Sequence, residues 1–255
     1  MKDESTSNPD GGWMITFASY SDTGSRPVNE DSIGVFEKNG YSLFVCCDGL
    51  GGHGMGDTAS RLVVQSFQET FDQFYDDQDF LKKGMELAQS ALLAEQRRLN
   101  AGRKMKTTVT VLLIGNGNAQ IAHIGDSRVY TFWKTKVKTR TLDHSVPQML
   151  VLTRQLKEKE IRNHPDRSLV LHVMGSPWGD ETPYEIAASI SLRLGHAFLL
   201  CTDGFWELID EKEMCRQMKA SASVQEWLFR MREIVKQNGA GTEMDNNSAI
   251  AVWNR

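Results

Sequence analysis

Four aspartates each adjoin an apolar, strand-like run of the sequence: Asp48, Asp126, Asp203 and Asp245. A carboxylate at the end of a strand is held rigidly and partly buried, and several of them brought together repel one another unless cations compensate. Carboxylate oxygens are hard ligands of the kind that Mg²⁺ and Mn²⁺ prefer. An Asp beside a Gly also commonly begins a turn. One such residue would indicate only a turn, whereas four at strand ends favour a metal site.

A second polar group lies near the N-terminus, where Arg26 is followed by Asn29, Glu30 and Asp31. The planar guanidinium of arginine is well shaped to bind a phosphate group through two hydrogen bonds at once. An arginine close to an acidic pair is also commonly a simple surface ion pair. Arg26 by itself therefore predicts no phosphate site, but it fits one if the aspartates hold metal ions.

The other common phosphate-binding motifs do not fit. The sequence has no Gly-Lys dipeptide, which excludes a P-loop, and no cysteine has an arginine six positions later. Gly49, Gly51 and Gly54 match the spacing of a dinucleotide-binding loop. However, the strand before them belongs to a predicted hairpin, and the acidic candidate Glu69 falls inside a predicted helix. We therefore do not expect this chain to bind a dinucleotide.

Composition narrows the class of protein further. The chain has 255 residues, of which 40% are hydrophobic and 24% charged, with a formal net charge of −4. The acidic balance argues against a nucleic-acid partner. The four cysteines form no Cys-x-x-Cys pair, and no segment approaches the roughly 20 apolar residues of a membrane span. We expect free thiols, a cytoplasmic location and no membrane segment.

Hydrophobic periodicity predicts strands, two helices, strands, two helices and a last strand. Two strands at 33–37 and 41–47 flank Asn39-Gly40, a strong signal for a hairpin turn. The other predicted strands are 107–114, 119–124, 129–133, 184–192, 196–202 and 248–253. The predicted helices are 59–74, 79–100, 147–160, 210–219 and 224–236. This order favours an α+β fold with layered antiparallel sheets over a doubly wound parallel sheet.

Six motifs together resemble those of the PPM/PP2C family of metal-dependent serine/threonine protein phosphatases, in its bacterial form. They are GSRPVNEDS (24–32), DGLGGH (48–53), GDSR (125–128), DHS (143–145), TDG (202–204) and DN (245–246). Each is weak alone, but the ordered set is specific and covers nearly the whole chain. The resemblance implies an αββα sandwich, in which two antiparallel β-sheets are flanked by helix pairs. We expect a flexible lead-in at 1–12 and a single domain at 13–255, with a flap at about 145–183.

The resemblance also implies two core Mg²⁺ or Mn²⁺ ions. Asp48 is expected to bridge both ions, and the carbonyl of Gly49 to bind one of them. Asp203 and Asp245 are expected to complete the first ion's ligands.

Four further positions receive roles in the same way. Glu30 and Asp31 are expected to serve the second ion, directly or through water, and Asp126 a third, more weakly bound ion. Arg26 is expected to bind the substrate phosphate.

The implied reaction is hydrolysis of phosphoserine or phosphothreonine by a hydroxide that bridges the two ions, with Asp48 and Arg26 as catalytic residues. The general acid stays open, because Leu50 stands where eukaryotic relatives carry a histidine, and His53 lies three residues later. Expected partners are phosphorylated proteins and an opposing Ser/Thr kinase, and we expect a monomer. The alternative is a catalytically silent module with this fold that binds phosphoproteins. The presence of Asp48, Asp203 and Asp245 argues against it.

Overall fold

Two antiparallel β-sheets form the centre of the computed structural model, which describes residues 4–7, 14–50, 54–102, 104–179 and 182–255. The first sheet has the strand order β1-β2-β12-β11-β7-β8. Its strands are β1 (Glu4–Ser7), β2 (Met14–Asp22), β12 (Asn247–Asn254), β11 (His196–Cys201), β7 (Arg128–Trp133) and β8 (Lys136–Arg140). Every neighbouring pair in this sheet is antiparallel.

The second sheet has the order β10-β6-β5-β4-β3, and β9 also pairs with β6. Its strands are β3 (Ser32–Lys38), β4 (Tyr41–Cys47), β5 (Val109–Gly115), β6 (Asn118–Ile124), β9 (Glu185–Ile186) and β10 (Ile190–Ser191). The predicted hairpin is confirmed as β3 and β4. Asn39 and Gly40 form its turn with positive φ angles of 49° and 80°, which asparagine and glycine tolerate best.

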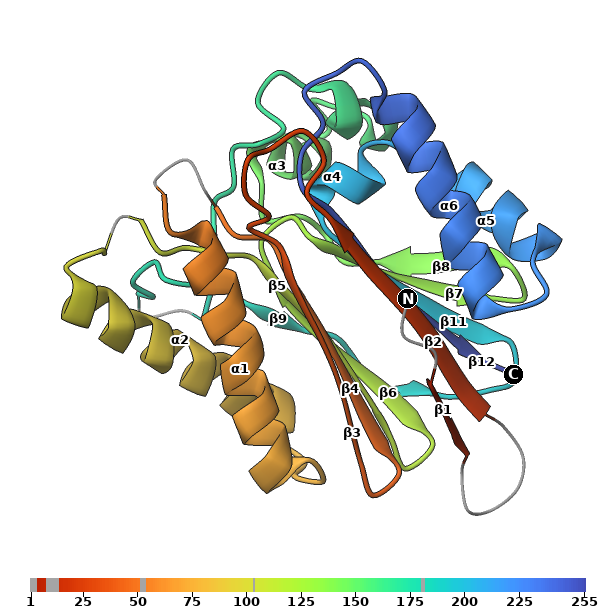
Figure 1. The fold of residues 1–255 in the computed structure, drawn as a ribbon, viewed down its shortest axis with the longest axis horizontal. Helices are drawn as coiled ribbons and strands as arrows, with labels where there is room; N and C mark the ends of the chain where they lie inside the picture. The colour runs from red at the N-terminus through yellow and green to blue at the C-terminus, as the bar shows by residue number, and fades with distance from the viewer. Residues whose placement is uncertain (1–3, 8–13, 51–53, 103, 180–181) are drawn as a thin grey trace.

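Helices cover the outer face of each sheet, as Figure 1 shows. The long helices α1 (Gly56–Phe74) and α2 (Phe80–Leu99) lie on one side of the molecule. On the other side lie α5 (Glu211–Ala220) and α6 (Val224–Gly239). Two short helices, α3 (Val146–Leu152) and α4 (Asp203–Trp206), complete the set together with a 3-10 helix at Glu158–Asn163. The predicted αββα sandwich is confirmed.

Strand alternation explains the layers. In β4, Val45 and Cys47 face the core beneath α1 and α2, whereas Phe44 and Cys46 face the core between the two sheets. A third hydrophobic cluster joins the first sheet to α5 and α6 and includes Trp227. Because β4 contributes to two cores, all its residues from 42 to 47 are buried. A strand that is apolar on both faces belongs inside a four-layer fold.

The flap region departs from the predicted elements. The helix expected at 147–160 ends at Leu152, because Arg154 takes a positive φ of 62° that cannot continue a right-handed helix. The strand expected at 184–192 is interrupted between β9 and β10, which both pair with β6 at the sheet edge. Strand β2 was not predicted at all. Within the predicted lead-in, residues 4–7 pair with β2.

In the ranges that the structure describes, no helix combines the length and the apolar character that crossing a lipid bilayer requires. Cys46, Cys47, Cys201 and Cys215 are free thiols, as expected from their spacing.

Candidate active site

Loops at one end of the two sheets bring the predicted carboxylates together. Asp48 follows β4, Asp203 begins α4 directly after β11, and Asp126 precedes β7. Burial raises the pKa of the Asp48 carboxyl well above its usual range, and the nearby charges of Asp203, Asp31 and Asp126 raise it further. Asp48 and Asp203 also share a side-chain hydrogen bond. Four acidic groups from separate loops therefore form one cluster.

The backbone of Asp48 is held by the start of the segment that leads into β5. Its N–H donates to Thr108 Oγ1 (3.0 Å), and its carbonyl accepts from Thr107 Oγ1 (2.7 Å) and Thr108 N (2.9 Å). These bonds fix the main chain of Asp48, and its side chain reaches Asp203. A rigid backbone holds a charged group near like charges that would otherwise push it away.

Gly49 permits the close approach of two further segments. A Cβ atom at this position would lie 2.3 Å from the carbonyl oxygen of Gly56 and 2.5 Å from that of Glu30. The Gly49 N–H donates to the same Glu30 carbonyl (3.1 Å). Only glycine fits here, so this residue type brings Glu30 and the start of α1 against the Asp48 loop.

Asp31 is the most enclosed acidic group of the cluster apart from Asp126. It is 7% exposed, and its Oδ2 accepts from Thr202 Oγ1 (2.9 Å). Its Oδ1 is buried without a hydrogen-bond partner. Burial, followed by the charges of Asp203 and Asp245, raises the pKa of Asp31 to about 7. An unpartnered buried carboxylate oxygen is costly and calls for a cation or a proton.

Arg26 lies at the exposed rim of the cluster, where it contacts Asp245. Arg26 Nε donates to Asp245 Oδ1 (2.9 Å) and Nη2 to Oδ2 (2.8 Å). The charge of Asp245 in turn contributes to the raised pKa of Glu30, whose first cause is burial. The predicted phosphate-binding arginine and the predicted metal ligands thus lie in one place.

A buried ion pair supports the Asp126 loop. Arg128 forms two hydrogen bonds with Asp143, at 2.8 and 2.6 Å, and both side chains are almost fully buried. The guanidinium of Arg128 stacks on the Trp206 ring at 3.4 Å, and Trp206 Nε1 donates to the carbonyl of Asp126 (3.0 Å). Burial raises the pKa of Asp126 well above its usual range, and Asp203 adds to the rise.

The segment predicted to form a flap contributes a charged group, Arg167, to this end of the molecule. Arg167 Nε donates to Glu207 Oε2 (2.9 Å), one turn after Asp203. Burial and the charge of Asp203 raise the pKa of Glu207 to about 7. The later part of this segment is bonded to α2, because Gln96 Nε2 donates to the Gly175 carbonyl (2.8 Å).

The donor set fits hard divalent cations. It consists of carboxylate oxygens and a backbone carbonyl, the ligands that Mg²⁺ and Mn²⁺ prefer. Burial raises the pKa of Asp48 and of Asp203, and the charge of Asp203 adds to the first and that of Asp245 to the second. Asp31 Oδ1 also lacks a partner, so positive charge would stabilise the cluster.

Sequence reasoning missed several supporting residues. Thr202 was seen only as part of a motif, yet its hydroxyl bonds to Asp31 and accepts from Ser248 N (3.0 Å). Arg128 and Asp143 were also quoted only within motifs. An arginine at the start of an apolar strand was the signal, because a buried arginine needs a partner. The candidate general acid His53 lies outside the described residues.

An αββα sandwich with a carboxylate cluster and a rim arginine at one end defines a metal-binding phosphatase class. The family model described as "Protein phosphatase 2C" matches residues 20–247. The chain belongs to this family.

Relatives and solved structures agree with this assignment. A serine/threonine phosphatase stp of Listeria welshimeri is 28% identical over 236 residues, which cover 89% of this chain and 90% of that protein. The serine/threonine protein phosphatase PstP of Mycobacterium tuberculosis is also 28% identical, but the match covers only 43% of its length.

Two crystal structures have the same fold. That of Mycobacterium tuberculosis PstP/Ppp has a TM-score of 0.80 at 27% identity and covers 93% of this chain and 97% of that one. That of Staphylococcus aureus Stp1 has a TM-score of 0.83 at 25% identity and covers 93% and 94%. A further solved structure is that of the catalytic domain of PstP in complex with two manganese ions.

Proposed function

We propose that this protein is a metal-dependent phosphatase that hydrolyses phosphoserine and phosphothreonine in proteins. The observation that carries the proposal is the cluster of buried carboxylates whose pKa values are raised by burial and by one another, with Arg26 at its rim. A phosphatase of this class needs two cations and one phosphate-binding group in one place. The named activities of the relatives and the manganese in one of them support the same conclusion.

Two Mg²⁺ or Mn²⁺ ions are assigned to the cluster. Asp48 would be a ligand of both ions, and the Gly49 carbonyl, Asp203 and Asp245 would complete the first set of ligands. Glu30 and Asp31 would serve the second ion, directly or through water. The hydrogen bond between Asp48 and Asp203 supports the first set, and the bond from the Gly49 N–H to the Glu30 carbonyl supports a second ion position beside the first.

Asp126 is assigned to a third, weaker ion. The charge of Asp126 raises the pKa of Asp48, and burial raises the pKa of Asp126 itself. Glu207 is a further acidic group next to Asp203, and its contact with Arg167 connects this edge of the cluster to the flap.

When bound, the ions supply a nucleophilic hydroxide near neutral pH and neutralise charge on the transferring phosphoryl group. The residues of this chain then hold the substrate. Arg26 is exposed at the rim and bonds to Asp245 through two nitrogens, so the same fork can turn to two phosphoryl oxygens. The backbone bonds of Asp48 hold the main chain from which its carboxylate extends.

The test is hydrolysis of a phosphothreonine peptide by metal-stripped protein, with and without added Mn²⁺. The variant Asp203→Asn removes one charge from the cluster and should lose turnover and Mn²⁺ affinity. The matched control is Asp210→Asn. Asp210 caps the start of α5, where its Oδ1 accepts from Glu213 N (2.7 Å), and asparagine caps a helix equally well. Turnover that needs neither Mn²⁺ nor Asp203 would refute the assignment. Mn²⁺ binding without turnover on any phosphopeptide would refute it in favour of a phosphoprotein-binding module.

Domain extent, oligomeric state, location and the opposing enzyme are further parts of the proposal. We propose a single phosphatase domain over 13–255 with a flap at about 145–183, and a monomer in the cytoplasm that acts against a Ser/Thr kinase. Light scattering coupled to size-exclusion chromatography checks the monomer, and limited proteolysis checks the domain.

A further inference from the structure

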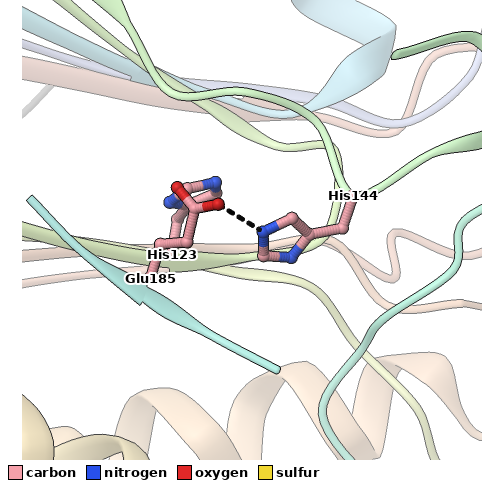
Figure 2. Close-up of side chains that lie close together, drawn as sticks. All are labelled: His123, His144 and Glu185. Atoms are coloured by element: carbon pink, nitrogen blue, oxygen red, sulfur yellow. Dashed lines mark ion pairs between the residues drawn. The ribbon is translucent and has the colours of Figure 1, made fainter. Parts of the chain in front are cut away.

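A second group of metal-binding side chains lies outside the carboxylate cluster. Figure 2 shows His123 from β6, Glu185 from β9 and His144 from the loop after β8 directed toward one another. One potential ligand atom from each side chain lies within 4.8 Å of the others. None of the three is among the residues assigned to the phosphatase centre.

The backbone holds these side chains in register. His123 and Glu185 are direct partners in the antiparallel ladder between β6 and β9, so their side chains lie on one face of the sheet. The His144 N–H donates to the carbonyl of Gly125 (2.9 Å), which fixes the third residue beside β6. His144 Nε2 lies 3.6 Å from Glu185 Oε1, and the rings of His123 and His144 are 4.8 Å apart between centroids.

The hydrogen bonds of His123 leave one ring nitrogen for a ligand. Its Nε2 is bonded to the carbonyl of Leu142 (2.8 Å) and must donate there, because a carbonyl only accepts. The lone pair of the neutral ring is then on Nδ1. A histidine that ligates a metal commonly has its other nitrogen bonded to a carbonyl in this way.

Both imidazoles are neutral at ordinary pH. Burial lowers the pKa of His144 to about 3, with the charges of His123 and His172 as further causes. Burial also lowers the pKa of His123. The neutral ring is the form that binds a metal ion. Neither ring therefore has to release a proton to solvent before it binds one.

We propose that His123, His144 and Glu185 form a site for a zinc-class transition-metal ion, with water as the fourth ligand. Two imidazoles and one carboxylate suit Zn²⁺, whereas the phosphatase cluster offers oxygen ligands alone and suits Mg²⁺ or Mn²⁺. A bound ion would fasten β9, where the chain returns from the flap, to β6 and to the loop that carries Asp143.

Binding carries one identifiable cost. His144 Nδ1 accepts from the Gly125 N–H at 3.3 Å, so the proton of the neutral ring is on Nε2, facing Glu185. The metal ion takes the place of this proton, which moves to Nδ1 and breaks the long bond to Gly125. A bond of 3.3 Å is weak, and the backbone bond from His144 N to Gly125 O is kept.

The test uses Co²⁺ and Zn²⁺ on the full chain. Co²⁺ in a four-coordinate nitrogen and oxygen site absorbs visible light far more strongly than Co²⁺ in a six-coordinate oxygen site. The wild-type protein and Asp203→Asn should both show the strong band at one equivalent. Glu185→Gln and His144→Gln should lose it, and their Zn²⁺ affinity should fall by about tenfold or more.

Controls make the outcome decisive. The side chain of Glu185 is 60% exposed, so Glu185→Gln should fold normally, and Glu69→Gln on the exposed face of α1 should keep the strong Co²⁺ band. A wild-type protein without that band would overturn the proposal. A band that persists in Glu185→Gln and His144→Gln, or one that disappears in Asp203→Asn, would also overturn it by placing the ion elsewhere.

Discussion

Arg26 and Asp245 form a two-point ion pair although they are 219 positions apart in the chain. Both side chains are about half exposed, at 55% and 46%, so water screens the pair and its net contribution to stability is at most about 1 kcal/mol. The weakness of the pair matters for function. Arg26 can leave Asp245 for a phosphoryl group at small cost, while Asp245 becomes available to a metal ion.

Arg26→Ala should therefore raise the KM for a phosphothreonine peptide by about tenfold or more, since a two-point bond to the phosphate is lost. Arg26→Lys keeps the charge but not the fork, and should recover only part of this loss. Steady-state kinetics with a parallel Mn²⁺ titration measures both effects. A lower melting temperature with an unchanged KM would contradict the phosphate-binding role.

The free energy of unfolding should depend on pH because the pKa of Asp31 is raised in the folded protein. Its folded pKa of about 7 lies above its ordinary value of 3.8, so the folded protein holds a proton that the unfolded chain has lost. The stability contributed by the protonated group is therefore complete below pH 4 and is lost as the pH rises toward 7, by at most about 1.4 kcal/mol per pH unit.

Urea unfolding in EDTA at several pH values, for wild type and Asp31→Asn, isolates this effect. The free-energy difference between the two proteins should move in favour of Asp31→Asn as the pH rises from 4 to 7. The comparison is needed because the buried, neutral His144 gives the opposite slope over much of the same window. A difference that stays constant with pH would show that Asp31 has an ordinary pKa.

Gly49→Ala should destabilise the protein by about 1–3 kcal/mol, because the new Cβ would collide with the carbonyls of Gly56 and Glu30. The same collision displaces Glu30, so Mn²⁺ affinity should fall as well. Gly102→Ala is the matched control, since its Cβ would meet only the side chain of Gln96 at 4.0 Å. Chemical denaturation and calorimetric Mn²⁺ titration measure the two effects, and equal behaviour of both variants would argue against the close approach.

Breaking the buried pair of Arg128 should be more costly still. Arg128→Met leaves the buried Asp143 with only the longer contact to Arg140 Nη1 (3.4 Å), and we expect a loss of about 3 kcal/mol. Arg98→Met, in an exposed pair with Glu95, should leave the denaturation midpoint unchanged. Similar midpoints for both variants would mean that water reaches Asp143. Restoration of stability by the double variant Arg128→Met with Asp143→Leu would confirm that the unpaired charge is the cause.

Local patterns predicted the long elements of the fold well. The spacing of hydrophobic residues predicted α1 and α2, and the apolar run predicted β4. Each pattern follows from burial of one or both faces of a single segment. Strand β2 and the four-residue helix α4 escaped prediction. A weakly alternating strand and a single helical turn depend on their neighbours for stability, and no single-segment pattern reports those neighbours.

By itself, the sequence determined the kind of chemistry and the family, because the motifs carry the residue types and the order that a carboxylate metal centre requires. Only the tertiary structure decided which groups meet. The contact of Asp31 with Thr202 spans 171 positions, and the pairing of His123 with Glu185 depends on where β9 joins the sheet. Such contacts result from the packing of whole layers, whose free energy is a sum over the entire chain and is not encoded in any one segment.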